Sequence, residues 1–396
     1  MLAALPFIIH DETGIEAERG INFALRQDDI QGRSSKKLHS STRLLSLGLL
    51  SLTTQLNMSS KVPISFACGL YDRMQALHSG EIKAEGIDLN FIVHNHPRDV
   101  FDRMSGGHEF EASEMSCSEY ICRYAAGERN FVAIPVFPSR AFRHGFIAVN
   151  DRIIKKPEDL NGKKIGVQLY TMTAAVWIRG LLKQYGVDLS TVTWVEGSME
   201  GPEPHGKPTV LPLLKPVSIT NNMSGKSLSQ LLEDGEIDAT IGADLPPCFG
   251  KAPHVKRLFP DFKEAEKKYY HEYGIFPVMH TVVIKREVHE KYPFVATSLF
   301  NALNDSKNVA YRRMRFLDAL RYMLPWLPAE IDEIDEVFKG DPWPYGVEPN
   351  RKTLEALVEC LYDQSMIEKK VIVDELFLQP RGQNWHIGWG PTQVAR

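Results

Sequence analysis

The chain has 396 residues, and its 46 Lys and Arg against 50 Asp and Glu give a formal net charge of −4 at pH 7. This near balance excludes a strongly basic nucleic-acid binder. Hydrophobic residues make up 43% of the chain and charged residues 24%, which is typical of a globular protein and not of a disordered or fibrous one. The length predicts two domains, because single hydrophobic cores stop growing near about 250–300 residues.

Cysteine usage and hydropathy bear on the compartment. The cysteines are odd in number and form no Cys-x-x-Cys pair; they are Cys68, Cys117, Cys122, Cys248 and Cys360. This pattern predicts reduced thiols and a cytoplasmic protein. No stretch reaches the roughly 18–20 consecutive apolar residues that a membrane span needs, so no membrane partner is expected.

Residues 1–57 differ in pattern from the rest of the chain. The apolar start Met1–Ile9 is followed by acidic residues, which argues against a secretory signal or a transit peptide. The apolar run Leu44–Leu52 lies too deep in the chain for an ordinary signal. We therefore expect 1–57 to be a poorly ordered extension before a candidate start at Met58, with a helix packed on the body as the alternative.

From Val62 onward, short β-rich runs alternate with helical patterns. The predicted strands are Val62–Cys68, Ile87–Val93, Phe131–Val136, Gly145–Val149, Ile165–Val167, Val192–Val195, Ala239–Ile241 and Thr281–Ile284. The predicted helices are Tyr71–His78, Pro97–Met104, Met172–Tyr185, Ser227–Glu233, Lys291–Leu324 and Thr353–Met366. This alternation is typical of βαβ units and predicts a largely parallel sheet.

The order of these segments predicts two α/β lobes with a ligand cleft between them. Lobe 1 is discontinuous, with residues 58–150 and 276–396, and lobe 2 contains residues 151–275. Ligands of such folds bind at the carboxyl ends of strands and at helix N-termini. Polar residues at those places are therefore the site candidates.

Two predicted helix starts carry hydroxyl side chains. Ser116 and Glu119 have the spacing of a capping box, which marks a helix N-terminus. Free N–H groups and partial positive charge at such an end make Ser116 and Ser118 candidates for holding a ligand carboxylate, with a purely capping role as the alternative. Thr171 and Thr173 begin a helix of lobe 2, and two helix ends facing one cleft would suit a dianion.

Arg140, Arg143 and His144 lie on the connection between two predicted strands. Arginine is planar and always charged, so it can bind a carboxylate through two parallel hydrogen bonds. The alternative for either arginine is a structural ion pair with Glu114 or Asp244. His144 is a candidate proton donor, and its alternative is a histidine bonded to the backbone.

Three further residues are predicted to lie at the cleft. Asp244 and His280 are at the ends of predicted strands. Arg73 is in the first turn of a predicted helix, where it faces the cleft or pairs with Glu81.

One histidine pair is a candidate metal site. His94 and His96 form a His-x-His pair at a strand end, with His108 and Glu114 close in the sequence. Imidazole and carboxylate ligands suit Zn²⁺ or Mn²⁺. The chain has no metalloprotease or zinc-finger spacing. We predict no metal site and keep a divalent ion at His94 and His96 as the alternative.

The chain resembles the 4,5-dihydroxyphthalate decarboxylase family over about residues 62–380. The segments that carry the resemblance are Ala67–Arg73, Glu114–Ser118, Ala133–His144 and Tyr170–Trp177. Of these, the run Ser139–His144 is the most specific. The resemblance implies a two-lobed type II periplasmic-binding-protein-like fold and a carboxy-lyase that removes CO2 from a hydroxylated aromatic acid without an organic cofactor.

For such a reaction we assign residues to four roles. Acid–base work goes to His144 or His280, carboxylate binding to Arg140 and Arg143 with Arg73 as a further candidate, substrate orientation to Ser116, Ser118, Thr171 and Thr173, and contact with the substrate hydroxyls to Glu114 or Asp244. The alternatives are a non-enzymatic solute-binding protein for a small carboxylate, and a metal-dependent decarboxylase or hydrolase that uses His94 and His96. The expected partner is a small aromatic acid, and Trp385 and Trp389 in the polar tail make a homodimer a candidate assembly.

Overall fold

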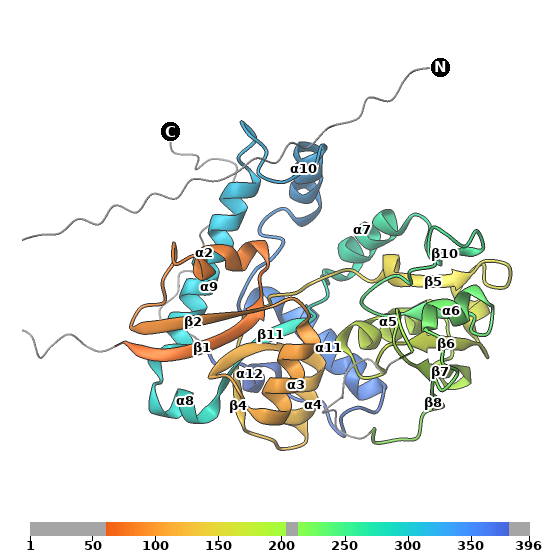
Figure 1. The fold of residues 1–396 in the computed structure, drawn as a ribbon, viewed down its shortest axis with the longest axis horizontal. Helices are drawn as coiled ribbons and strands as arrows, with labels where there is room; N and C mark the ends of the chain where they lie inside the picture. Colours follow the sequence, from red (N-terminus) through yellow and green to blue (C-terminus); the bar gives the residue numbers. More distant parts are fainter. Residues whose placement is uncertain (1–60, 203–212, 380–396) are drawn as a thin grey trace, which may run out of the picture. The chain divides into compact units, whose positions relative to one another are not determined.

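A computed structural model describes residues 61–202 and 213–379. These residues belong to a compact unit that begins at Ser59. The extension predicted over residues 1–57 and the tail with Trp385 and Trp389 lie outside the described residues. Two β-sheets with helices packed against them make up the described part (Figure 1).

The first sheet has five strands in the order β2-β1-β3-β11-β4. Their bounds are β1 Val62–Gly69, β2 Ile87–His94, β3 Ala112–Ser116, β4 Phe131–Ile134 and β11 His280–Lys285. β1 pairs in parallel with β2 and β3, whereas β11 is antiparallel to both β3 and β4. β11 comes from the C-terminal half of the chain, so the first lobe is discontinuous in sequence.

The second sheet has six strands in the order β10-β5-β9-β6-β7-β8. Their bounds are β5 Ile147–Asn150, β6 Lys164–Val167, β7 Thr193–Glu196, β8 Ile219–Asn221, β9 Ala239–Ile241 and β10 Val255–Arg257. β6 pairs in parallel with β7 and β9, and β7 with β8, while β5 is antiparallel to β9 and β10.

The sheets refine one sequence expectation and correct another. Both are largely parallel, as predicted, but each is mixed through one strand that runs against all the others, β11 in the first sheet and β5 in the second. The strand β5, which the boundary at residue 150 places in lobe 1, pairs within the second sheet. The chain therefore reaches the second sheet before residue 147. The sheet pairings do not otherwise test the predicted lobe boundaries, which stay a prediction.

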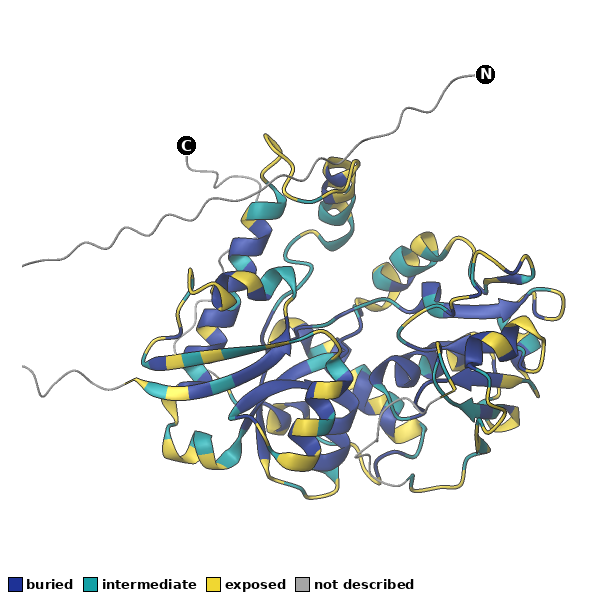
Figure 2. Cartoon of the chain, in the orientation of Figure 1, coloured by how far each residue is buried: buried dark blue, intermediate teal, exposed yellow. Residues whose placement is uncertain are grey.

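Central strands of both sheets are buried along most of their length (Figure 2). β1 alternates at its start and is fully buried over its last four residues. β3 is buried at all five positions although it contains Ser113, Glu114 and Ser116. Burying a carboxylate is unfavourable unless it is paired and hydrogen-bonded, so a polar central strand points to a site.

The helices pack on the sheets and begin with recognisable signals. Their bounds are α2 Gln75–His78, α3 Pro97–Gly107, α4 Cys117–Ala125, α5 Thr173–Gln184, α6 Leu228–Glu233, α7 Phe262–Tyr273, α8 Arg286–Lys291, α9 Phe294–Met314, α10 Leu327–Phe338, α11 Arg351–Asp363 and α12 Val373–Leu376. Pro97 occupies the first turn of α3, where its missing N–H costs nothing. In α6, Ser227 and Gln230 form a complete capping box.

The helix predicted over Lys291–Leu324 is divided. Pro293 separates α8 from α9, and α9 ends at Met314. Its C-terminal apolar residues continue into a loop whose side chains are exposed, which explains why an apolar pattern extended the prediction too far. Within the described residues, no helix combines the length and the apolar character that crossing a membrane requires.

Two chain segments cross between the sheets side by side, as the sequence predicts. The Met279 N–H donates to the Ser139 carbonyl over 2.8 Å, and the Ala141 N–H donates to the Pro277 carbonyl over 3.2 Å. Arg140 lies between them and forms an antiparallel bridge with Val278. Arg140 is therefore on the connection itself, next to the start of β11.

Candidate active site

Polar residues meet at one edge of the first sheet. β1 and β3 are parallel, so their carboxyl ends at Gly69 and Ser116 lie at the same edge. β11 is antiparallel, and its first residue, His280, is paired with Ser116. This edge is where a ligand of an α/β protein is expected.

Glu114 and His280 form a buried ion pair at this edge. The His280 Nδ1 lies 2.5 Å from Glu114 Oε1, and the Glu114 side chain is 0% exposed while that of His280 is 17% exposed. Burial opposes ionisation of Glu114, but the charge of His280 and the hydrogen bonds from Gly69 and Tyr71 hold the pKa of this carboxyl below its ordinary value. Glu114 is thus a carboxylate that holds the Nδ1 side of the His280 ring.

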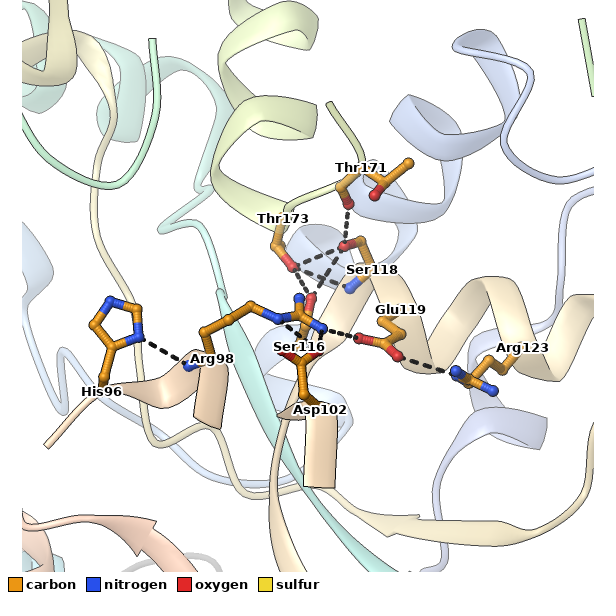
Figure 3. Close-up of polar contacts among 9 residues, drawn as sticks. All are labelled: His96, Arg98, Asp102, Ser116, Ser118, Glu119, Arg123, Thr171 and Thr173. Carbon is orange, nitrogen blue, oxygen red and sulfur yellow. Dashed lines mark hydrogen bonds and ion pairs between the residues drawn. The ribbon is translucent and has the colours of Figure 1, made fainter. Parts of the chain in front are cut away.

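Hydroxyl groups from two helix starts meet beside this pair. Ser116 Oγ lies 2.9 Å from Thr173 Oγ1, and Ser118 Oγ lies 2.9 Å from the same atom. The Ser118 N–H donates to Thr173 Oγ1 over 3.1 Å, and the Ser118 hydroxyl donates to the Thr171 carbonyl over 3.0 Å. Figure 3 shows the three hydroxyls turned toward one another from the starts of α4 and α5. The predicted helix ends therefore face each other.

The capping box predicted at Ser116 is only half right. Ser116 is the N-cap of α4, but its hydroxyl makes no cap hydrogen bond within the described residues and bonds to Ser118 and Thr173 instead. Glu119 accepts from Arg123 Nε over 3.2 Å and lies 3.9 Å from Arg98 Nη2 (Figure 3). Glu119 is thus paired with Arg123 on the next turn of α4 and lies near Arg98 of α3.

Arg73 lies close to the Glu114–His280 pair and is held by aromatic rings. Its guanidinium carbon is 4.3 Å from the Tyr71 ring centroid and 4.6 Å from that of Trp343. Arg73 Nε donates to the Pro138 carbonyl over 2.5 Å, and Nη1 contacts Asp72 over 3.0 Å. The predicted alternative of a pair with Glu81 is wrong, because the partner of Glu81 is Arg313.

Arg140 is a buried cation with unused donors. It is 7% exposed, and its Nη2 donates to the Phe276 carbonyl over 2.8 Å. Its Nε and Nη1 are buried and have no hydrogen-bond partner among the described residues. Burial lowers the pKa of Arg140 to about 10, which leaves it charged at neutral pH. The predicted structural alternative, a pair with Glu114 or Asp244, is not what the structure shows.

Asp341, the carboxylate whose charge acts on Arg140, already accepts hydrogen bonds from other side chains. Asp341 accepts from Lys307 Nζ over 2.6 Å and from the Tyr311 hydroxyl over 2.6 Å. The Tyr345 hydroxyl nearby is buried and, among the described residues, has no hydrogen-bond partner. Two cations and one carboxylate leave this cluster with an excess of positive charge, which an incoming anion would balance.

Arg143, His144 and Asp244 belong to a different cluster. His144 is 1% exposed and packs edge-on against Phe259 and Tyr269. Burial lowers the pKa of His144 to about 4, so its imidazole is neutral at pH 7. Arg143 donates to the Ala243 carbonyl over 3.4 Å, and Asp244 is exposed. The structure does not place these three predicted residues with Glu114 and His280.

Similarity to known proteins shows the family to which this chain belongs. Residues 76–202 match the family described as NMT1/THI5 like. The chain is 36% identical over 321 residues to a 4,5-dihydroxyphthalate decarboxylase of Comamonas testosteroni, a match that covers 80% of this chain and 97% of that protein. The chain belongs to the 4,5-dihydroxyphthalate decarboxylase family. A second member, from Pseudomonas putida, is 39% identical over 214 residues, or 53% of this chain and 82% of that protein.

The chain is also similar to two solved structures of sulphonate-binding proteins named SsuA. The aliphatic sulphonate binding protein SsuA of Escherichia coli has a TM-score of 0.48 and 14% identity, covering 80% of this chain and 98% of that chain. The SsuA of Xanthomonas axonopodis pv. citri bound to MOPS has a TM-score of 0.43 and 10% identity, covering 81% and 98%. The two mixed sheets and the family membership confirm the predicted two-lobed type II periplasmic-binding-protein-like fold.

The histidine pair weighed as a metal site is engaged otherwise. His94 Nε2 lies 3.1 Å from Arg103 Nη1, and His96 is the N-cap of α3, where its Nδ1 accepts from the Arg98 N–H over 3.3 Å. In the part of the chain that the structure describes, no three His, Cys, Asp or Glu side chains come together as a ligand set.

The sequence does not mark two groups of residues that contact the site. Tyr71, whose hydroxyl donates to Glu114 over 2.8 Å, is predicted only as the start of a helix. Its position two residues after a strand that ends in glycine is the one local signal for it. Trp343, Asp341 and Lys307 approach from segments about 200 residues further along the chain, and no local pattern marks them.

A cavity of about 600 Å³ lies away from these residues. It is lined by side chains of α5, α7 and α11, including Trp177, Tyr269 and Cys360, and by none of the predicted site residues. The candidate site is therefore identified from its convergent polar groups and not from a void. Its hydroxyls are in direct contact, as expected for lobes that have closed on each other.

Proposed function

We propose that this protein is a non-oxidative decarboxylase of a hydroxylated phthalate, with 4,5-dihydroxyphthalate as the substrate that its relatives' names indicate. The observation that carries the proposal is the Glu114–His280 pair, which lies at the ligand-binding edge of the fold in a member of this family. A histidine held by an ionised carboxylate is suited to supplying the proton that replaces CO2.

The chemistry requires one proton and no redox partner. In 4,5-dihydroxyphthalate, one hydroxyl is para to a carboxylate, and ionising that hydroxyl moves electron density to the ring carbon that bears the carboxylate. That carbon accepts a proton, the bond to the carboxylate breaks, and its electron pair restores the aromatic ring as CO2 leaves. The product is 3,4-dihydroxybenzoate, and the atoms and charge balance with one proton consumed per CO2 released.

His280 is the proposed proton donor. The Glu114 carboxylate stabilises the imidazolium form and holds the ring through Nδ1, so Nε2 delivers the proton. His144 is less suited because burial in an aromatic pocket keeps it neutral, with a pKa of about 4. Asp244 is exposed and has no role in this proposal.

Arg140 and Arg73 supply the positive charge that the substrate needs. We assign Arg140 to the carboxylate that the substrate keeps, because its buried Nε and Nη1 groups lack a partner among the described residues. Arg73, beside Tyr71 and Trp343, faces the same region and balances the charge of the ionised hydroxyl. A fixed guanidinium where negative charge develops lowers the barrier to reaction.

The hydroxyls of Ser116, Ser118 and Thr173 complete the proposed site. In this structure they bond to one another across the two lobes. Substrate entry therefore requires the lobes to part, and an incoming carboxylate then replaces the hydroxyl contacts at two helix N-termini. The two crossing segments at Ser139 and Met279 are where such a motion bends the chain.

The proposal includes no organic cofactor, because the electron pair of the breaking bond returns to the ring. We also propose a cytoplasmic location. The five cysteines are free thiols, and four of them are buried, which supports a reducing compartment.

The test is incubation of the purified protein with 4,5-dihydroxyphthalate, phthalate and 4-hydroxybenzoate while CO2 release is followed. We expect release from the dihydroxy acid, none from phthalate, and loss of release in His280→Asn. Tight binding of the dihydroxy acid without CO2 release would instead support a solute-binding protein and contradict the proposal. Correct folding of the variant is checked by its circular dichroism spectrum and melting temperature.

A further inference from the structure

Tyr71 contacts three parts of the candidate site at once. Its hydroxyl donates to Glu114 Oε1 over 2.8 Å, its ring face covers Arg73, and its ring edge lies against Gly69. We infer that Tyr71 is a positioning residue that holds Glu114 against His280 and limits how tightly that pair keeps its proton. The inference rests on the proposed function for the meaning of that proton, but its geometry stands by itself.

The Glu114 carboxylate is shared among four donors. Oε1 accepts from the Tyr71 hydroxyl and from His280, and Oε2 accepts from the Gly69 N–H over 3.2 Å and contacts Cys68 Sγ at 3.4 Å. A carboxylate has about four lone-pair positions, so these donors use its full capacity. Each donor stabilises the anion, and each therefore reduces the share of negative charge that acts on the imidazolium of His280.

The Tyr71 ring packs so closely against Gly69 that no side chain fits at that position. A Cβ added at Gly69 would lie 2.8 Å from the Cζ atom of Tyr71 and 3.0 Å from its hydroxyl oxygen. No real Cβ approaches another atom so closely, so any side chain there displaces the ring. Burial and the charge of Glu114 raise the pKa of Tyr71 well above its ordinary value, so the hydroxyl stays a donor at every physiological pH.

Removing only the hydroxyl separates these roles. Tyr71→Phe keeps the ring against Gly69 and beneath Arg73 but takes one donor from Glu114 Oε1. The carboxylate then acts more strongly on His280, the imidazolium holds its proton more tightly, and transfer to a ring carbon becomes slower. The His280 ring should therefore keep its proton to higher pH in Tyr71→Phe than in the wild type.

The direct test is an NMR titration of the His280 ring protons, assigned among the 13 histidines by His280→Asn. We expect an upward shift of the pKa in Tyr71→Phe and in Gly69→Ala, and no shift in Tyr120→Phe. Tyr120 is the matched control because its buried hydroxyl donates to the Leu376 carbonyl and not to Glu114. Equal titration curves for Tyr71→Phe and the wild type would overturn the inference.

Activity adds a second readout and separates the two proposals. If the protein releases CO2, the alkaline limb of its kcat profile should move upward in Tyr71→Phe, with about a tenfold lower plateau. If it releases none, the proposed function fails while the titration still decides the role of Tyr71. A lower melting temperature with unchanged titration and pH profile would show a merely structural residue.

A second and independent observation concerns the loop between α9 and α10, residues 316–326. Figure 2 shows it mostly in yellow, and it exposes six large apolar side chains: Phe316, Leu317, Leu320, Met323, Leu324 and Trp326. Met323 is 100% exposed and Trp326 is 76% exposed. So many apolar side chains on one short exposed loop are typical of a protein–protein contact surface.

We propose that a second copy of this chain covers the loop. Exposed charges of both signs lie around and within it: Arg312 precedes the loop, Asp318 and Arg321 belong to it, and Asp332 and Glu336 follow on α10. In a two-fold interface each patch meets its own copy, so it must be complementary to itself. An apolar patch with exposed charges of both signs meets this condition, because basic groups of one copy can face acidic groups of the other.

The test is the mass in solution, measured by light scattering after size exclusion. We expect a wild-type dimer and a monomer for the double variant Met323→Glu, Trp326→Glu. Met223→Glu is the matched control, since Met223 is 89% exposed but lies beyond β8 in the second lobe. A monomeric wild type, a dimeric double variant, or a dimer lost only on removal of residues 380–396 would each overturn the proposal.

Discussion

Two histidines of this protein lie beside glutamates, one partly exposed and one buried, and their surroundings differ. His280 is 2.5 Å from Glu114, whose carboxylate also accepts hydrogen bonds from Tyr71 and Gly69. His144 is 3.9 Å from Glu266, and its ring is enclosed by Tyr185, Phe259 and Tyr269. The first pair lies at the strand ends of lobe 1, and the second lies between β5 and α7.

The difference shows how donors decide the charge of a buried pair. Hydrogen bonds and the facing imidazolium keep the pKa of Glu114 low despite complete burial. Burial prevails at the other pair, where it raises the pKa of Glu266 to about 7 and lowers that of His144 to about 4. Glu114 is therefore held as a carboxylate, whereas burial favours the uncharged forms of Glu266 and His144, although both pairs consist of a histidine and a glutamate.

The sharpest way to break this comparison is to remove each histidine. We expect His280→Asn to lower kcat by about 10²- to 10⁴-fold, as for loss of a general acid. His144→Gln should leave the rate per folded molecule within a few-fold of the wild type. Both are measured as CO2 release after active protein is corrected for folding. A large loss in His144→Gln with full activity in His280→Asn would reverse the assignment.

The arginines sharpen the same contrast. Arg140→Ala should lower kcat/KM by about 30- to 1000-fold. It removes a buried cation whose Nε and Nη1 groups have no hydrogen-bond partner among the described residues. Arg140→Lys keeps the charge but loses the planar fork and should recover only part of that loss. Arg143→Ala, in the region of His144 and Glu266, should affect the rate less. If both alanine variants are folded and fully active, the charge comes from Arg73.

The shifted pKa values of Glu266 and His144 predict how the stability of the fold depends on pH. A glutamate whose folded pKa is about 7, against 4.5 when exposed, stabilises the fold below pH 4.5 and loses that contribution as the pH rises through 7. The wild type should therefore lose about 2–5 °C of melting temperature relative to Glu266→Gln between pH 4.5 and 8.

His144 works in the opposite direction. Its folded pKa of about 4, against 6.5 when exposed, gives stability that is present above pH 6.5 and lost as the pH falls through 4. Melting curves of the wild type and Glu266→Gln at half-unit steps separate the two groups. A constant difference between the two proteins across the whole range would contradict the raised pKa of Glu266.

The smallest effect is expected at a third pair of histidines that belongs to neither region. His94 contacts Arg103 and His96 caps α3, so the double variant His94→Ala, His96→Ala should keep kcat within several-fold. Treatment with a chelator should change the rate equally little. Loss of both bound metal and activity in the double variant would favour the metal-dependent alternative.

Sequence reasoning recovered more of the fold than of the site. The alternation of strands and helices placed most elements, and the return of a late strand to lobe 1 followed from their order. The sequence did not predict β3, because its residues Ala-Ser-Glu-Met-Ser lack the apolar pattern of a buried strand. That polar composition is itself a consequence of the site, since Glu114 is tolerated there only through donors from other elements.

Among the candidate residues, local position placed His280 at a strand end and Ser116, Ser118 and Thr173 at helix starts, but it gave no place to Glu114, which lies on the unpredicted strand β3. It did not separate His280 from His144, since both follow a loop next to a strand. Which of them meets a carboxylate with hydrogen-bond donors depends on β1, β3 and β11 lying side by side. That pairing joins residues 46 to 166 positions apart in the chain.

The sequence by itself determined the α/β alternation, the helix starts and the kinds of side chain available, because these depend on short-range periodicity and on capping chemistry. Only the tertiary structure decided which charges are paired. A pKa depends on burial and on donors within a few ångströms, and both come from segments that are distant in sequence. The same chain thus holds one histidine that contacts an ionised carboxylate and another that is buried as a neutral ring.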